Sequence, residues 1–182
     1  MSNEVTIKDN TDEVLRELDK AMERALLACG MEAERAAKLN LRKSKAVDTG
    51  LLRNSITYAL AGQEAHIKTY KADKLPRWER KKRRKKGEPE KEKQSGEYIG
   101  VAPGEVGEKA VYVGTNVEYA PYVEFGTGMY VPGGSKPWHY KDAGGNWHYT
   151  KGMRARPYLK PAVTENADKF RKIIESELKK DI

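Results

Sequence analysis

The chain has 182 residues, of which 34% are charged and 38% are hydrophobic, so it is more polar than a typical globular domain with roughly 25% charged residues. This length fits a single domain spanning residues 1–182, and the composition argues against a large apolar core. No stretch approaches the roughly 18 consecutive apolar residues of a membrane helix, and Met1 to Asn10 lack the apolar centre of a signal peptide. We therefore expect synthesis in a reducing cytoplasm and no membrane partner.

The net charge of +8 is concentrated in one segment. Residues 71–96 contain twelve basic and five acidic residues, and the rest of the chain is close to neutral. This segment includes seven consecutive basic residues: Arg80, Lys81, Lys82, Arg83, Arg84, Lys85 and Lys86. The residues that follow are rich in Gly, Pro, Glu, Lys and Ser and show no periodicity. We therefore interpret 71–96 as an exposed, mobile basic insertion within a near-neutral domain.

The first predicted element is a long helix over residues 11–43. It contains no proline, and apolar residues recur at three- and four-residue steps along one face. Asn10, with Glu13 three residues later, is typical of a helix N-cap. The apolar stripe is rich in alanine, which predicts close approach by another element. The lone Cys29 falls in this stripe and excludes an intramolecular disulfide, so we interpret it as a small buried group.

Short elements are predicted in the middle of the chain. Residues 48–50 have turn composition, and they precede a helical turn at 51–55 and a strand at 56–60. Residues 65–70 alternate weakly and are predicted to return as the hairpin partner of that strand. A further strand is predicted at 110–115, after regular structure resumes at residue 97.

The C-terminal half is predicted to contain a short helix, a hairpin and a final helix. Pro121 suits the first turn of the short helix and Gly126 suits its end. Two aromatic runs, 138–140 and 147–149, flank a Gly-rich turn and predict a β-hairpin. The final helix is predicted over 162–180. This order of elements predicts an α+β fold, in which an antiparallel sheet is packed by a long N-terminal helix and a C-terminal helix.

Three aromatic residues in the short helix are spaced three apart: Tyr119, Tyr122 and Phe125. We expect them to form one face that packs on the sheet or on the first helix. Glu124 would then point away from that face and pair with Arg53 or Arg156.

No motif indicates catalysis. His139 and His148 lie in Trp-His-Tyr triplets on the two arms of the predicted hairpin, but no third metal ligand accompanies them. We interpret them as polar residues of a half-exposed hairpin. Glu118 and Glu124 have no obvious acid–base partner. We therefore expect no enzymatic activity, no cofactor and no metal.

Two features suggest a binding partner. Eight of the ten tyrosines lie between Tyr98 and Tyr158, where they either roof the protein's own core or form an interface; the low apolar content favours an interface. The basic run 80–86 has three interpretations: a solvated loop, a non-specific contact with DNA phosphates, or a contact with an acidic protein surface.

Three segments resemble the tail-completion, or head–tail joining, proteins of long-tailed phages. The first signature segment, 47–56, resembles that family's D-T-G-x-L-R-x-S-I motif. The second, 113–127, contains Val-Gly-Thr and then Tyr-Ala-Pro-Tyr-Val-Glu-Phe-Gly-Thr, and the third, 153–162, resembles A-R-P-F-L-x-P-A. The matching residues are Asp48, Thr49, Gly50, Leu52, Arg53 and Ser55, then Tyr119, Ala120, Tyr122, Glu124, Phe125, Gly126 and Thr127, and finally Arg156, Pro157 and Pro161.

The resemblance implies a virion structural protein, made in the host cytoplasm, that has no catalytic function or cofactor. Such a protein would sit in the virion neck or tail, where it completes the tail end or joins it to the head connector. It would form a ring, expected to be a hexamer, with tail terminator or tail-tube proteins as further partners and genomic DNA in the channel. Residues 71–96 depart from the family pattern. The alternative function is a DNA-binding or DNA-processing protein that uses the basic run 80–86.

Overall fold

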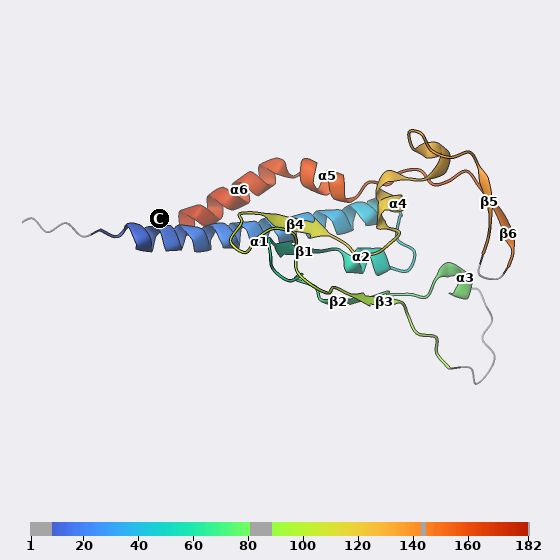
Figure 1. The fold of residues 1–182 in the computed structure, drawn as a ribbon, viewed down its shortest axis with the longest axis horizontal. Coiled ribbons are helices and arrows are strands. Elements are labelled where there is room, and N and C mark those ends of the chain that lie inside the picture. Colours follow the sequence, from blue (N-terminus) through green and yellow to red (C-terminus); the bar gives the residue numbers. More distant parts are fainter. Residues whose placement is uncertain (1–8, 81–88, 143–144, 182) are drawn as a thin grey trace, which may run out of the picture.

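The computed structural model describes residues 9–80, 89–142 and 145–181. Its longest element is α1 (Thr11–Lys43), which runs along the long axis of the molecule (Figure 1) and has the bounds predicted from its apolar periodicity. Asn10 is the N-cap of α1, as predicted, but its side chain makes no capping bond; its carbonyl oxygen accepts the backbone N–H groups of Glu13 and Val14 at 3.1 Å. The Asp9 carboxylate accepts the N–H of Thr11 at 2.9 Å instead.

The alanine-rich stripe of α1 allows the close approach that the sequence predicts. Its buried residues are mostly small: Ala21, Ala25, Cys29, Gly30, Ala33, Ala36, Ala37 and Leu41. At Gly30, an added Cβ would lie 2.7 Å from the Tyr58 ring and 2.9 Å from Val111. Since Tyr58 and Val111 belong to paired strands, Gly30 is the point where the sheet packs directly on the helix.

The strands in the described part of the chain form three separate antiparallel pairs. β1 (Thr57–Leu60) pairs with β4 (Val111–Gly114), and β2 (Thr69–Lys71) pairs with β3 (Ser95–Glu97). β5 (Trp138–Lys141) pairs with β6 (Trp147–Thr150), which is the predicted C-terminal hairpin.

The predicted pairing of residues 65–70 with 56–60 is wrong. After β1 the chain turns at Gly62, whose φ is +66°, and Gly62 donates to the carbonyl of Pro103 at 3.3 Å. Gln63 then accepts the N–H of Ala102 at 2.8 Å, so the chain first follows residues 101–103. The chain then touches β1 through two N–H groups: that of His66 donates to the carbonyl of Tyr58 at 2.8 Å, and that of Ile67 donates to the Thr57 hydroxyl at 2.9 Å. It continues into β2, whose partner is β3.

The remaining helices are short. α2 (Leu51–Ser55), α3 (Arg77–Arg80) and α4 (Ala120–Phe125) precede the 3₁₀ turn Gly128–Tyr130, and the chain ends in α5 (Leu159–Thr164), α6 (Ala167–Leu178) and the 3₁₀ turn Lys179–Asp181.

The single final helix predicted over 162–180 is wrong in two respects: it begins earlier, at Leu159, and it is divided at Glu165 and Asn166. The Asn166 side chain donates to the carbonyl of Ala162 at 3.0 Å, a local bond that competes with the helical ladder.

α6 lies antiparallel beside α1 (Figure 1), where Lys169 pairs with Glu32 at 2.8 Å and Glu177 approaches Arg24 at 3.9 Å. The core is small and lies between α1, α2, α4 and α5; its largest members are Leu41, Leu51, Leu52, Ile56, Val123 and Tyr158. The fold is therefore the predicted mixture of helix and antiparallel sheet, with a long N-terminal and a C-terminal helix. None of its described helices is apolar enough over a sufficient length to cross a membrane.

The segment 71–96, predicted to be a basic insertion, is described only in part. Its ends belong to the β2–β3 pair, and α3 lies within it, so these parts have regular structure. Lys81, Lys82, Arg83, Arg84, Lys85 and Lys86 lie outside the described residues.

Candidate functional site

The second and third signature segments pack together through their backbones. Thr127 donates its N–H to the carbonyl of Met153 at 2.8 Å, and its hydroxyl accepts the N–H of Met153 at 2.9 Å. Arg156 donates its N–H to the carbonyl of Val123 at 2.8 Å. Gly126 has a φ of +82°, and a Cβ there would lie 2.7 Å from the backbone nitrogen of Ala155. Glycine is therefore required where the two segments cross.

Glu124 holds the beginning of α5. Its carboxylate is 6% exposed and accepts three backbone N–H groups: those of Tyr158 at 2.7 Å, Leu159 at 3.0 Å and Lys160 at 2.9 Å. The first N–H groups of a helix have no partner within the helix, and a negative charge there is favourable. The next residue, Pro161, has no N–H to satisfy. The Glu124 carboxylate therefore caps α5 from a distant part of the chain.

The predicted ion pair of Glu124 with Arg53 or Arg156 is wrong. Arg53 pairs with Asp73, and the Arg156 guanidinium donates to the backbone carbonyl of Lys45 at 3.2 Å. The carboxylate is already satisfied by three donors, so it needs no arginine.

Tyr158 fills the centre of the core. It is fully buried, and its hydroxyl has no hydrogen-bond partner in the part of the chain that the structure describes. Burial, together with the nearby Glu124 carboxylate, raises the pKa of Tyr158 above its ordinary value. The hydroxyl therefore stays protonated and contributes no hydrogen bond to offset its burial.

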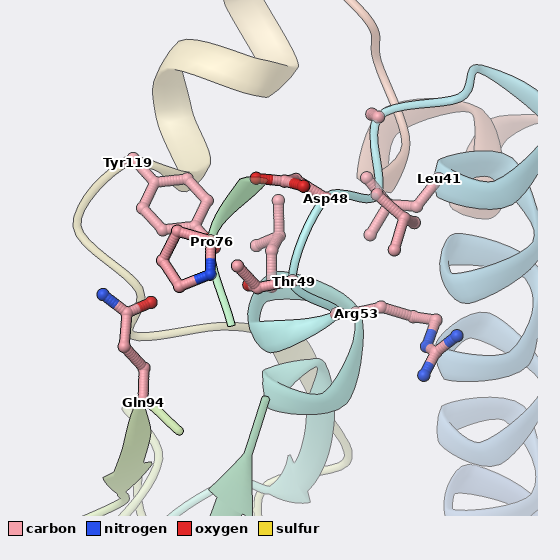
Figure 2. Close-up of a pocket in the computed structure, with 11 residues that line it drawn as sticks. Leu41, Asp48, Thr49, Arg53, Pro76, Gln94 and Tyr119 are labelled. Atoms are coloured by element: carbon pink, nitrogen blue, oxygen red, sulfur yellow. The ribbon is translucent and has the colours of Figure 1, made fainter. Parts of the chain in front are cut away.

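The first signature segment lines a pocket of about 350 Å³. Figure 2 shows Thr49 and Arg53 on this segment, the Tyr119 ring beside Pro76, and the Arg53 side chain extending away from Tyr119. Tyr119 belongs to the second segment and is the N-cap of α4, so the pocket lies where the first and second segments meet.

Gly50 and Asp73 fix the shape of the first segment. The φ of Gly50 is +86°, and an added Cβ would lie 2.8 Å from the carboxylate carbon of Asp73. Asp73 accepts a hydrogen bond from the Asn54 side chain at 2.8 Å and also pairs with Arg53. The Asn54 bond and the Arg53 charge hold the pKa of Asp73 below its ordinary value. The backbone N–H of Asp73 donates in turn to the carbonyl of Thr49 at 2.9 Å.

Two further contacts connect this segment to its surroundings. The buried Ser55 hydroxyl donates to the carbonyl of Leu52 at 2.9 Å and lies 2.6 Å from the Thr115 hydroxyl of the second segment. Asp48 pairs with Arg80, the first residue of the basic run. The structure therefore ties the start of that run to the first signature segment.

The predicted packing of the aromatic face of α4 is wrong. Ala120, Val123 and Glu124 are the buried residues of this helix, and they lie on its other side. The three aromatic residues are exposed: Tyr119, Tyr122 and Phe125. The three- and four-residue spacing of Ala120, Val123 and Glu124 was the available signal, but a buried glutamate does not stand out in a sequence.

The histidines of the hairpin lie on opposite faces. In the β5–β6 register, Tyr140 is opposite His148 and His139 is opposite Tyr149. Side chains of neighbouring positions along a strand point to opposite faces, so His139 and His148 do not converge. His148 lies 2.9 Å from the Asp142 carboxylate instead. Among the described residues, no cluster of three or more metal-ligating side chains is present.

Comparison with known proteins gives a family match. A family model described as "Bacteriophage HK97-gp10, putative tail-component" matches residues 6–126. This range includes the first signature segment and the second up to Gly126, and the third lies beyond its end. No curated protein and no solved structure matches the chain.

Proposed function

Because the chain belongs to the HK97-gp10-like family of bacteriophage tail components, we propose that it is a structural protein at the head–tail junction of a long-tailed phage. In this role it completes the end of the tail or joins it to the head connector, as a subunit of a ring. The family match covers two thirds of the chain and is the observation that carries the proposal. It supports a structural rather than an enzymatic role in the virion tail.

The character of the surface supports assembly with other proteins. The core is small, and large side chains on α1, α4 and the β5–β6 hairpin are exposed. A ring subunit can have such a surface because its neighbours cover part of it.

The signature residues have a defined place in this proposal. Glu124, Gly126 and Thr127 fasten the third segment to the second, and Thr49, Gly50 and Ser55 shape the first. These contacts hold α4 so that Tyr122 and Phe125 face outward, where a virion partner such as the head connector can contact them. Tyr119 lines the pocket beside the first segment instead. We assign the contact with the partner to Tyr122 and Phe125, and the role of the other signature residues to maintaining the fold.

Deletion of the gene tests this function. We expect filled heads and separate tails in electron micrographs of the lysate, and joined particles when the wild-type gene is supplied in trans. A double substitution of Tyr122 and Phe125 by serine should also fail to restore joining, although the purified variant remains folded. Normal joined virions from the deletion would refute the proposal.

DNA contact is the second candidate, and the seven consecutive basic residues of the run 80–86 favour it. We expect duplex binding that weakens steeply with salt, because neutralising phosphates releases counterions. Replacing residues 81–86 by glutamine should abolish this binding. A control variant carries Arg171→Gln and Lys172→Gln on the exposed side of α6. Absence of DNA binding by the wild type at low salt would remove this candidate.

A further inference from the structure

Two uncovered surfaces lie at opposite ends of the long axis of the molecule (Figure 1): the beginning of α1 and the β5–β6 hairpin. Residues 11–20 of α1 are all exposed, whereas the helix is partly buried from Ala21 onward. Glu177 of α6 approaches Arg24, the final 3₁₀ turn also contacts α1, and Lys109 pairs with Asp19 at 2.9 Å. These contacts leave residues 11–20 exposed, so the apolar side chains of the first turns of α1 stay largely uncovered.

These first turns carry an apolar stripe. Val14, Leu15 and Leu18 are 58%, 53% and 49% exposed. Helical spacing places Val14 and Leu18 in line with Ala21 and Ala25, which are buried. The stripe that packs the core thus continues uncovered toward the N-terminus.

The hairpin offers an aromatic and basic face. The register places His139, Lys141, Trp147 and Tyr149 on one face and Trp138, Tyr140, His148 and Thr150 on the other. Trp147 and Tyr149 are 66% and 56% exposed, and the Lys141 ammonium lies 4.9 Å from the centre of the Trp147 ring. A two-stranded hairpin is marginally stable by itself in water. A partner that covers its aromatic face would therefore stabilise this hairpin.

The charges of the two surfaces are complementary. Residues 9–23 contain six acidic and two basic side chains, whereas residues 136–151 contain three basic and one acidic side chain. Helix geometry places Asp12 and Glu17 beside the apolar stripe, and Arg16 and Lys20 on the far side of α1. The acidic border of the stripe thus matches the basic border of the hairpin face.

We infer that the hairpin face of one copy, formed by Trp147, Tyr149 and Lys141, docks on the stripe Val14, Leu15 and Leu18 of a second copy. One chain cannot make this contact with itself, because the two surfaces lie at its opposite ends. The contact joins two different surfaces. In the proposed ring each copy uses its hairpin toward one neighbour and its α1 toward the other, and repetition forms a ring when the rotation between neighbours closes. This inference rests on the ring of the proposed function and names its contact.

Complementary variants test the contact in solution. The variant Trp147→Ser/Tyr149→Ser should associate at least about 30-fold more weakly than the wild type in sedimentation analysis up to 500 µM, as loss of a central aromatic contact predicts. The variant Leu15→Gln/Leu18→Gln should be weakened similarly. When the two variants are mixed, one hairpin and one α1 surface remain intact, so a 1:1 dimer and nothing larger should form. The control Tyr140→Ser, on the other face of the same hairpin, should assemble like the wild type.

Disulfide trapping detects the contact if association is weak. With Cys29→Ala as background, Leu15→Cys and Tyr149→Cys in one chain should give a ladder of covalent oligomers on oxidation. Leu15→Cys with Tyr140→Cys is the control and should give several-fold less. The inference would be overturned if the wild type stayed monomeric and the Leu15→Cys/Tyr149→Cys chain gave no more covalent oligomer than its control. It would also be overturned if the hairpin variant Trp147→Ser/Tyr149→Ser assembled normally. Deletion of the gene tests the proposed function separately from this contact. If the deletion left heads and tails unjoined but the cysteine pair gave no covalent oligomers, the proposed function would stand and only this contact would be refuted.

Discussion

The substitution Glu124→Gln should destabilise the protein strongly, although it preserves the shape of the side chain. The carboxylate accepts three backbone N–H groups at 2.7 to 3.0 Å at the beginning of α5. A glutamine oxygen can keep the bonds from Tyr158 and Leu159, but its amide group then faces the N–H of Lys160, and two donors cannot bond. A hydrogen bond to a charged group contributes about 1.5–3 kcal/mol, and a buried donor without a partner costs about 1–3 kcal/mol.

We therefore expect the free energy of unfolding to fall by about 2–4 kcal/mol, which is a large fraction of the roughly 5–15 kcal/mol of a typical domain. For a chain of this size the melting temperature should fall by roughly 4–16 °C. Denaturant unfolding followed by circular dichroism measures the first quantity, and thermal melts measure the second. Glu118→Gln, an exposed carboxylate in the same segment, is the matched control and should stay within about 0.5 kcal/mol of the wild type. If Glu124→Gln also left the free energy of unfolding within about 0.5 kcal/mol of the wild type, the Glu124 carboxylate would not be an important cap of α5.

Three further predictions concern single side chains. Gly126→Ala should cost about 2–4 kcal/mol, because strain at positive φ adds to a clash with backbone, whereas Gly107→Ala, at a φ of +96° in open space, should cost only about 1 kcal/mol in denaturant unfolding. Folding lowers the pKa of Asp73 below its ordinary value of 3.8. Asp73 therefore contributes to the free energy of unfolding above pH 3.8, and this contribution is lost as the pH falls through the pKa of the folded state. Asp73→Asn should accordingly reduce the loss of stability at acid pH. Tyr158→Phe should leave the free energy of unfolding unchanged or raise it by about 1 kcal/mol, because the buried hydroxyl has no described partner.

Each of these predictions can fail in a distinct way. Equal costs at Gly126 and Gly107 would mean that the two crossing segments separate easily. If Asp73→Asn lost stability at acid pH as steeply as the wild type, the Asp73 carboxylate would be no better stabilised in the folded state than in the unfolded chain. A loss of more than about 1 kcal/mol in Tyr158→Phe would reveal a partner for the hydroxyl.

The sequence predicts α1 accurately because its signal is repeated over 33 residues without a proline. The hairpin and the short helix α4 were also predictable, from turn composition, Pro121 and Gly126. Each of these elements is defined by residues that are neighbours in the sequence.

Strand pairing was harder because strands of three or four residues show too little alternation to choose a partner. The partner of β1 is decided by the turn at Gly62, which directs the chain along residues 101–103. The positions of the β1–β4 and β2–β3 pairs therefore depend on contacts between distant backbones.

The capping of α5 by Glu124 could not be predicted because it also depends on backbone groups that are distant in the sequence. Side-chain patterns suggest arginine as the partner of a carboxylate, but the actual partners are backbone N–H groups, which every residue except proline carries. A signal was available in the third segment, where α5 begins at Leu159 with Tyr158 in place of a Ser, Thr, Asp or Asn cap. A helix that lacks a local cap needs an acceptor from elsewhere.

The antiparallel packing of α1 against α6 has a consequence for biosynthesis. The ribosome makes α1 before α6, so the stripe containing Cys29 stays without its final cover while roughly 130 further residues are added. At a synthesis rate of roughly 5–20 residues per second, this interval is on the order of ten seconds. During that time a nascent chain can expose an alanine-rich helix to other nascent chains on the same messenger RNA. Completion of this packing is therefore a late event that waits for α6 to leave the ribosome.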